Sequence, residues 1–333
     1  MKKRYIIIFS FLLIIFFLSG CVCLSTSQPR DLKAGKFVVL LPGETGDLSW
    51  NDSNYEGIQA CKEHLNIEIE CITNVQEFEF EMILTEYGEK GYDLICAAGT
   101  QFDEPVNTVA PNFPETIFCV INGEKCEYDN VTLINPKEYE ASYLAAVIAG
   151  NLNENTIGVI AGYPNSSMEY LLDIYEYKTR ATAEENGVSC KASLRAYTNS
   201  WTDRELGKKM ALQMIDSGVN TLFVYTNEAG LGCIEAATER GAKIIGFSSD
   251  ATKEYPDTVI ASIKFDFGKI YEKIFTLYEK GTLTKSDTHK LGVKEDIFEP
   301  IYSEYISQDI QNAVAEEMLK IENGKINFSD YHY

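Results

Sequence analysis

Short apolar runs alternate with amphipathic segments along most of this chain. The runs are rich in Val, Ile, Leu and Phe, and between them lie segments such as 203–218, in which apolar residues recur at helical spacing. Such alternation predicts parallel sheets whose buried strands are covered by helices on both faces. The predicted strands are 37–43, 66–72, 92–99, 116–123 and 131–135 in a first series, and 156–162, 190–198, 221–227 and 242–250 in a second.

Two such series predict an α/β protein with two doubly wound lobes rather than one large domain. After the second series the sequence indicates a strand at 258–265, a helix, and a last strand within 290–302. We assign residues 36–133 with 258–282 to an N-terminal lobe, and residues 134–257 with 283–333 to a C-terminal lobe.

The first 20 residues form a secretory signal rather than a part of the fold. Basic "MKKR" precedes an apolar run from Tyr5 to Leu18, which is shorter than the roughly 20 residues that a membrane-spanning helix needs. The following "LSGC" resembles the lipobox of prokaryotic lipoproteins, so we expect Cys21 to carry a lipid. Residues 21–35 would then tether the folded part to the outer face of the cell membrane.

Charge and cysteine content narrow the classes of function. The 50 acidic and 29 basic residues give a net charge of −21, which argues against nucleic-acid binding because that depends on Lys and Arg. No Cys/His cluster has metal-ligand spacing, so we expect neither a metal site nor a cofactor. Cys61–Cys71 and Cys119–Cys126 remain possible disulfides, although seven cysteines beyond the lipid end are an odd number.

The two tryptophans stand in similar local sequences, "GDLSWND" around Trp50 and "YTNSWTD" around Trp201. Each follows a predicted strand and precedes a predicted helix, and open parallel sheets bind ligands at the carboxyl ends of their strands. Two facing indole rings could hold one flat ring between them. A loop tryptophan can also be a packing residue, but the matching positions favour a shared cleft.

Four stretches in the same order resemble the basic membrane protein family, the solute-binding lipoproteins of ABC importers for purine nucleosides and related purines. This resemblance implies a type I periplasmic-binding-protein fold with three crossovers and a cleft that closes. Family members stack the base between two aromatic side chains, whose positions correspond to Trp50 and Trp201. The four stretches are 109–123, 138–152, 157–164 and 244–250.

The resemblance and the strand-end positions together give a set of candidate ligand contacts. Asp250 is the strongest polar candidate, because a carboxylate accepts strong hydrogen bonds from purine N–H groups. Ser248 replaces the first acid of the family's Gly-x-Asp-x-Asp motif, which favours a free base over a nucleoside. Helix capping, turns or ion pairs could instead explain several of these residues. The candidates are Trp50, Trp201, Asp250, Asp47, Asn51, Ser49, Phe102, Thr100, Asn227, Ser249, Lys264 and Tyr163.

The expected partners are a purine, a membrane permease of the ABC class, and the membrane itself through Cys21, with the protein a monomer. Alternatively, the closed protein could signal to a receptor instead of delivering its ligand. The three histidines, His64, His289 and His332, lie away from the strand-end motifs. We therefore expect no enzyme, and an extracytoplasmic purine nucleoside hydrolase is the remaining catalytic alternative.

Overall fold

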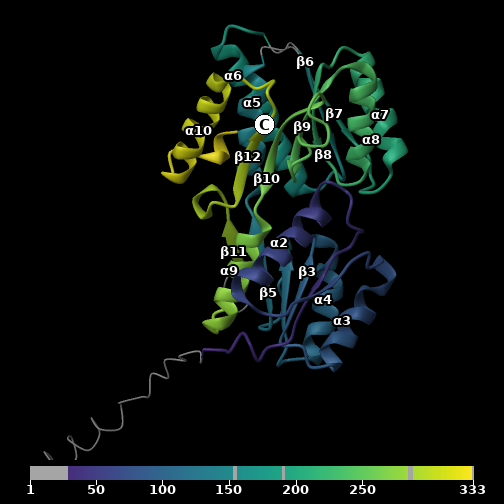
Figure 1. Cartoon of the computed structure of the whole chain (residues 1–333), viewed down its shortest axis with the longest axis vertical. Coiled ribbons are helices and arrows are strands. Elements are labelled where there is room, and N and C mark those ends of the chain that lie inside the picture. Colours follow the sequence, from purple (N-terminus) through teal and green to yellow (C-terminus); the bar gives the residue numbers. More distant parts are fainter. Residues whose placement is uncertain (1–28, 153–155, 190–191, 284–287, 332–333) are drawn as a thin grey trace, which may run out of the picture.

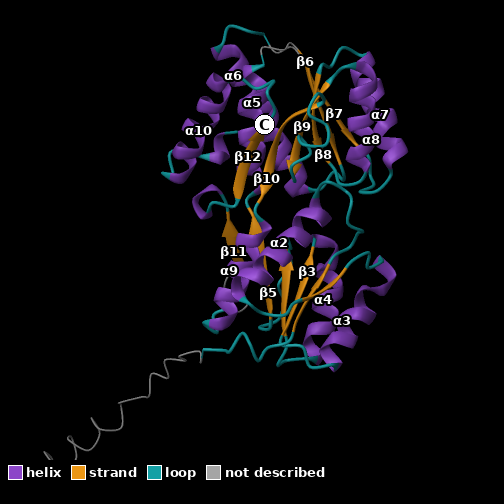
Figure 2. Cartoon of the chain, viewed as in Figure 1, coloured by secondary structure: helices purple, strands orange, loops and turns teal. Residues whose placement is uncertain are grey.

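The computed structural model consists of two lobes, each built on a six-stranded sheet (Figure 1). It describes residues 29–152, 156–189, 192–283 and 288–331. Each sheet is covered by helices on both faces, and the two sheets follow one another along the long axis of the molecule (Figure 2). The expected α/β class with two doubly wound lobes is confirmed.

The first sheet is parallel throughout, with the strand order β11-β5-β4-β3-β1-β2. Its helices are α2 (Trp50–Leu65) and α9 (Phe267–Glu279) on one face, and α3 (Phe80–Glu89) and α4 (Asp103–Val109) on the other. The strands are β1 (Phe37–Leu40), β2 (Glu70–Ile72), β3 (Leu94–Ala98), β4 (Ile117–Ile121), β5 (Val131–Pro136) and β11 (Thr288–Leu291).

The second sheet has the order β12-β10-β9-β8-β6-β7, and only β12 is antiparallel to its neighbour. Its strands are β6 (Thr156–Ala161), β7 (Ala192–Tyr197), β8 (Thr221–Tyr225), β9 (Lys243–Ser248), β10 (Val259–Phe265) and β12 (Phe298–Tyr302). Its helices are α5 (Glu138–Asn151), α6 (Ser166–Glu185) and α10 (Gln308–Glu322), with α7 (Arg204–Asp216) and α8 (Ala229–Arg240) on the opposite face.

The apolar runs form strands because both of their faces are buried. In β1, Phe37 and Val39 face the core beneath α2 and α9, whereas Val38 and Leu40 face the core beneath α3 and α4. Alternate residues of a strand point to opposite sides, so a strand between two helix layers must be apolar at every position. This requirement explains why these strands appear in the sequence as continuous hydrophobic runs.

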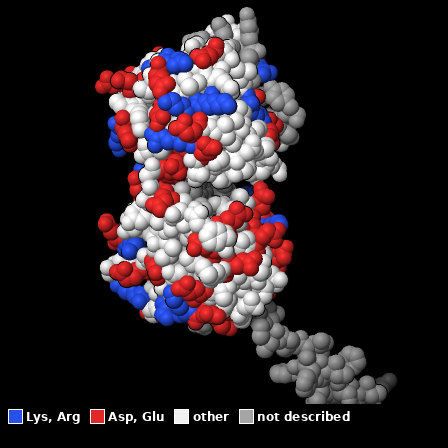
Figure 3. Space-filling model, turned by 90° about the vertical axis from the view of Figure 1, so that its right-hand side faces the viewer, with Lys and Arg blue, Asp and Glu red and all other residues white. Residues whose placement is uncertain are grey.

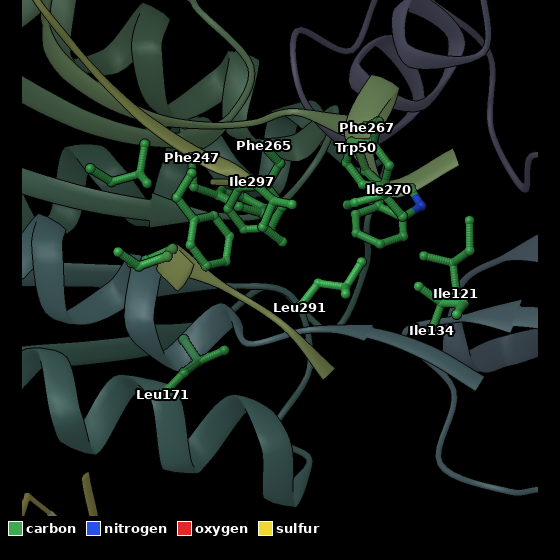
Figure 4. Close-up of a cluster of buried hydrophobic side chains, with 14 of the residues drawn as sticks. Trp50, Ile121, Ile134, Leu171, Phe247, Phe265, Phe267, Ile270, Leu291 and Ile297 are labelled. Carbon is green, nitrogen blue, oxygen red and sulfur yellow. The ribbon is translucent and has the colours of Figure 1, made fainter. Parts of the chain in front are cut away.

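The chain passes between the lobes three times, as the family resemblance implied. It crosses after β5, returns between β10 and α9, and crosses again between β11 and β12. One buried cluster is continuous through these crossings: Trp50 lies beside Phe267 and Ile270 at one end, and Phe247 lies beside Phe265 at the other (Figure 4). The lobes therefore share packed side chains at the hinge.

The predicted lobe boundaries differ from the observed sheets at two strands. β10 lies in the second sheet, although residues 258–282 were assigned to the N-terminal lobe, and β11 lies in the first sheet, although residues 283–333 were assigned to the C-terminal lobe. The assignment was wrong for these strands because each lies directly before a crossing, and a local hydrophobic pattern does not specify which sheet a strand joins.

Neither possible disulfide is formed in the structure. The cysteines that it describes, Cys61, Cys71, Cys96, Cys119, Cys126 and Cys233, are all reduced. Cys21 and the predicted signal segment lie outside the described residues. Among the helices that the structure describes, none combines the length and hydrophobicity needed to cross a membrane.

Candidate functional site

A pocket lies between the two lobes, and both tryptophans line it. Its volume is about 110 Å³, well above the roughly 10–15 Å³ that a single water occupies by this measure. The pocket can therefore hold a small ligand. Its lining consists of Trp50, Gly99, Thr100, Gln101, Asn122, Gly123, Glu124, Asn135, Glu138, Asn165, Ser167, Met168, Leu171, Trp201, Tyr225, Asn227 and Phe247.

Trp50 is the first residue of α2 and is only 8% exposed. Its ring nitrogen Nε1 donates to the backbone oxygen of Ala98 at 3.1 Å, and the ring of Phe267 packs against it edge to face, with centroids 5.1 Å apart. These two contacts fix the indole in one orientation. Trp50 therefore presents a rigid apolar surface to the pocket.

Trp201 follows β7 in the other lobe and is half-buried. Its ring lies against Gly162, where an added Cβ would come within 2.2 Å of the indole carbon Cζ3, and Tyr163 packs beside it at 5.4 Å between centroids. The indole can occupy this position because Gly162 has no side chain. Sequence reasoning placed both tryptophans in one cleft, and they do line one pocket.

The deep polar side chains of the pocket were not among the predicted contacts. Asn122 follows β4, Asn135 lies in β5, Glu138 begins α5, and Tyr225 ends β8. Burial raises the pKa of Glu138 to about 7, although its neighbours Tyr225 and Asn122 act to lower it. Their positions at or near strand ends could have identified them, and Asn122 and Glu138 also lie within the family-like stretches 109–123 and 138–152.

Asn122 and Asn135 are held in place by specific hydrogen bonds. Asn122 has a φ of 62° and donates through Nδ2 to Oε2 of Glu138 at 3.3 Å. Asn135 donates through Nδ2 to the backbone oxygen of Gly123 at 2.8 Å, while its Oδ1 is buried without a partner. The hydroxyl of Tyr225 is buried beside the Glu138 carboxyl group. The pocket thus holds an unsatisfied acceptor, Oδ1 of Asn135.

Of the other predicted residues, Thr100 and Asn227 line the pocket. Ser49 does not line it, but its hydroxyl donates to Oδ1 of Asn227 in the opposite lobe at 3.5 Å. Asn227 lies two residues after the end of β8 at Tyr225. This end is where parallel sheets bind ligands.

Asp47 and Asn51 organise the start of α2. The Asp47 carboxylate accepts hydrogen bonds from the backbone N–H groups of Ser49, Asn51 and Asp52, and from the side chain of Asn51 at 2.8 Å. Burial nevertheless raises the pKa of Asp47, because desolvation outweighs these bonds. The carboxylate oxygens therefore satisfy the first N–H groups of the helix, as in N-capping.

Residues around the end of β9 and the start of α2 form hydrogen bonds between the lobes beside the pocket. Ser53 donates to the backbone oxygen of Ser248 at 2.9 Å, and Ser248 donates to the Ser53 hydroxyl at 3.1 Å. Ser249 donates to the backbone oxygen of Leu48. At another point of the cleft, Ser167 of α6 donates to Glu124 at 2.9 Å. These bonds describe a closed arrangement of the lobes.

An outer cavity of about 550 Å³ adjoins the pocket and shares Thr100, Trp201 and Asn227 with it. Tyr163, Asp47 and Asn51 line this outer cavity and not the inner pocket. Seen from the side, the molecular surface narrows between the lobes, and acidic side chains are spread over both of them (Figure 3). The inner pocket and outer cavity together form the interlobe cleft.

Asp250, Lys264 and Phe102 lie outside both of these cavities. Asp250 binds Lys253 at 3.0 Å and accepts from the Thr252 hydroxyl at 2.5 Å; burial acts to raise its pKa, but these contacts leave it below the ordinary value. Lys264 lies opposite Glu299 in the pairing of β10 with β12. Phe102 is fully buried and stacks on Phe80 with centroids 3.9 Å apart.

Comparison with known proteins agrees with this architecture. The family model described as "ABC transporter substrate-binding protein PnrA-like" matches residues 34–330. The transcriptional activator protein Med of Bacillus subtilis is 25% identical over 318 residues, 95% of each chain. A purine-binding protein of Brucella abortus is 27% identical over 306 residues, which cover 90% of this chain and 83% of that one.

A solved ABC transporter solute-binding protein from Aeropyrum pernix K1 has a TM-score of 0.77 with this structure. It is 25% identical, and the alignment covers 88% of this chain and 92% of that one. Relatives also include basic membrane proteins of Borrelia garinii and Borreliella burgdorferi, so the family resemblance seen in the sequence is confirmed. The chain belongs to the PnrA-like family of ABC transporter substrate-binding proteins.

Proposed function

We propose that this protein captures a purine, with a free base preferred to a nucleoside, in the cleft between its lobes. The observation that carries the proposal is that Trp50 and Trp201, from different lobes, line one small pocket. Aromatic side chains of this kind bind flat heterocycles by stacking. The purine-binding relative from Brucella abortus supports the same class of ligand.

In this mechanism the ligand enters the open cleft and stacks on Trp50, whose orientation is already fixed by Ala98 and Phe267. Closure brings Trp201 to the opposite side of the ring and forms the interlobe bonds of Ser49 and Ser53. Polar side chains then contact the ring edge, and a wrong base leaves buried polar groups unpaired.

Two features support a base over a nucleoside. Ser248, which stands where nucleoside binders of the family carry an acid, is fully buried and bonded to Ser53, so its hydroxyl is not available to a ribose. Lys264 lines neither the pocket nor the outer cavity. A sugar would have to extend past Trp201 into the outer cavity, which Asp47 and Asn51 border.

Of the contacts predicted from the sequence, four have the geometry to touch a ligand in the pocket: Trp50, Trp201, Thr100 and Asn227. Tyr163, Asp47 and Asn51 border only the outer cavity. The remaining predicted residues would affect ligand binding only through the surrounding structure, or not at all. They are Ser49, Ser249, Asp250, Lys264 and Phe102. Substitution of each group, with affinity and stability measured separately, tests these assignments.

We further propose that the protein is a monomer anchored through Cys21 outside the cell membrane, and that it delivers its ligand to an ABC permease. The lipobox-like "LSGC" at residues 18–21 and the family description support this placement. A sensor that passes its closed state to a receptor is the second candidate. A relative in Bacillus subtilis that is named a transcriptional activator supports this sensor role as the second candidate.

A thermal-shift panel tests the proposed function directly. The full chain in detergent is unfolded and refolded to remove any ligand, then mixed with purine bases, nucleosides, pyrimidines and amino acids. A ligand at 100 times its Kd stabilises the folded state by about 2.7 kcal/mol, which raises the melting temperature visibly.

A rise in melting temperature with bases that exceeds the rise with nucleosides supports the proposal, and no rise with any purine contradicts it. Nucleosides recovered unchanged after incubation argue against the hydrolase. For the delivery role, loss of purine uptake in cells that lack the protein favours transport. Loss of a transcriptional response with normal uptake favours the sensor.

A further inference from the structure

The inner pocket carries negative groups and no positive ones. Glu124 and Glu138 are part of its lining, and among the lining residues in the described part of the chain there is no Lys, Arg or His. Burying an anion without a paired cation is strongly unfavourable. A ligand that carries a phosphate, a carboxylate or a negatively charged ring is therefore excluded by charge.

The deep end of the pocket is rich in hydrogen-bond acceptors. Asn135 uses its amide nitrogen on the backbone oxygen of Gly123 at 2.8 Å, which leaves Oδ1 buried without a donor. Glu138 accepts from Asn122 at 3.3 Å with one carboxylate oxygen, Oε2. A buried acceptor without a donor is unfavourable, so a ligand that brings N–H groups to this place is stabilised.

Tyr225 limits how this region can adapt. Its ring stacks on Phe247 with centroids 3.6 Å apart and an interplanar angle of 12°, and Phe223 packs edge to face on it at 5.7 Å. The phenol is therefore fixed beside Glu138, and its hydroxyl interacts with that carboxyl group. Fixed polar groups discriminate between ligands more strongly than mobile ones do.

We propose that Glu138, supported by Asn135 and Tyr225, is the specificity-determining residue of this pocket and selects an uncharged or cationic purine with an exocyclic amino group. This inference rests on the proposed purine-binding function and refines its ligand class. Adenine and guanine carry such an amino group, whereas hypoxanthine and unsubstituted purine do not. Nucleoside monophosphates carry a phosphate and are rejected.

The binding of an amino-substituted purine should depend on pH through Glu138, whose pKa burial raises to about 7. Only the ionised carboxylate accepts hydrogen bonds with both oxygens, so affinity rises as the pH increases from 6 to 8. Other titratable groups share its cavities: Glu124 and Tyr225 in the inner pocket, and Lys137, Tyr139, Tyr170 and Lys290 in an adjoining cavity of about 220 Å³ that Glu138 also lines.

The experiment is isothermal titration calorimetry on the stripped full chain in detergent, with adenine, hypoxanthine, unsubstituted purine and adenosine monophosphate. Adenine should bind at least tenfold more tightly than hypoxanthine or purine, and the monophosphate at least 100-fold more weakly than adenine. Glu138→Gln keeps the shape of the side chain but removes its charge, and should weaken adenine binding about tenfold. In this variant the affinity for unsubstituted purine should change less than threefold, and the pH dependence of adenine binding should disappear.

Glu63→Gln is the matched control. Glu63 is an exposed residue in the last turn of α2, and its substitution removes the same charge as Glu138→Gln does. It should leave all affinities unchanged. The melting temperature of each ligand-free variant shows whether it folds; if Glu138→Gln does not, the ligand ranking and the pH profile of the unmodified protein decide.

The possible failures are distinguishable. Purines that bind with no preference for the amino group, or a preference that survives Glu138→Gln, overturn this inference and leave the proposed function standing. Tight binding of the monophosphate also overturns it. If none of the purines binds, both the inference and the proposed function fail.

Discussion

Substituting Gly162 by alanine tests whether the position of Trp201 determines affinity. An added Cβ would lie 2.2 Å from Cζ3 of the indole and 2.5 Å from Cε3 and Cη2, whereas carbon atoms in favourable contact are about 3.5–4.0 Å apart. The ring must therefore move by roughly 1 Å or more. Trp201 is half-buried beside the outer cavity, so it can move there without disrupting the core.

We expect Gly162→Ala to weaken binding of the preferred purine by about 10- to 100-fold, which corresponds to the loss of most of one base–aromatic stack of about 1–3 kcal/mol. The free energy of unfolding should change by less than about 1 kcal/mol, because φ at this position is not in the left-handed region and the added methyl restricts the unfolded chain. Calorimetric titration and urea denaturation measure the two quantities.

Gly246→Ala is the control for this substitution. Gly246 lies in β9, and its added Cβ would approach no atom closer than the Ser262 hydroxyl oxygen at 3.3 Å. Its affinity for the purine should equal that of the unmodified protein. If Gly162→Ala binds within twofold of the unmodified protein, the indole either does not lie against Gly162 or does not contact the ligand, and the reasoning is refuted.

Three further substitutions separate the roles of residues near the cleft. Trp50→Ala should weaken purine binding by about 1–3 kcal/mol in calorimetry, and unchanged binding would exclude its ring from the site. Asp47→Ala should lower the free energy of unfolding by about 1–2 kcal/mol in urea, because it removes the acceptor for the backbone N–H groups of the N-cap residue Ser49 and of Asn51 and Asp52 in α2; an effect on affinity alone would contradict this. Asp250→Asn should change affinity less than threefold, since Asp250 lines neither cavity; a tenfold loss would restore it as a ligand contact.

The sequence predicted most of the fold because the strands are buried on both faces. Continuous apolar runs such as "FVVL" at β1 and "LICAA" at β3 leave little choice of structure. The predicted strand at 66–72 proved shorter, since only Glu70–Ile72 pair with β1. β2 lies at the sheet edge, where one side has no partner strand and pairing is shorter.

The site was predicted in part. The two tryptophans were identified from repeated sequence context, and both line the pocket. Phe102 was chosen for its position at a strand end, yet it is fully buried against Phe80. A one-dimensional pattern locates a residue at the correct end of a sheet, but the packing of neighbouring helices decides whether its side chain points to the cleft or to the core.

By itself, the sequence determined the class of the protein: two α/β lobes, a strong excess of acidic residues, and paired tryptophans after predicted strands. Each of these depends on residues that are close in the chain. Only the tertiary structure decided that Glu138, Asn135 and Tyr225 line one pocket. It also decided that the Ser248 hydroxyl forms a hydrogen bond to Ser53 of the other lobe and does not line that pocket. These contacts join residues far apart in sequence, and burial and pairing arise only when the two lobes pack together.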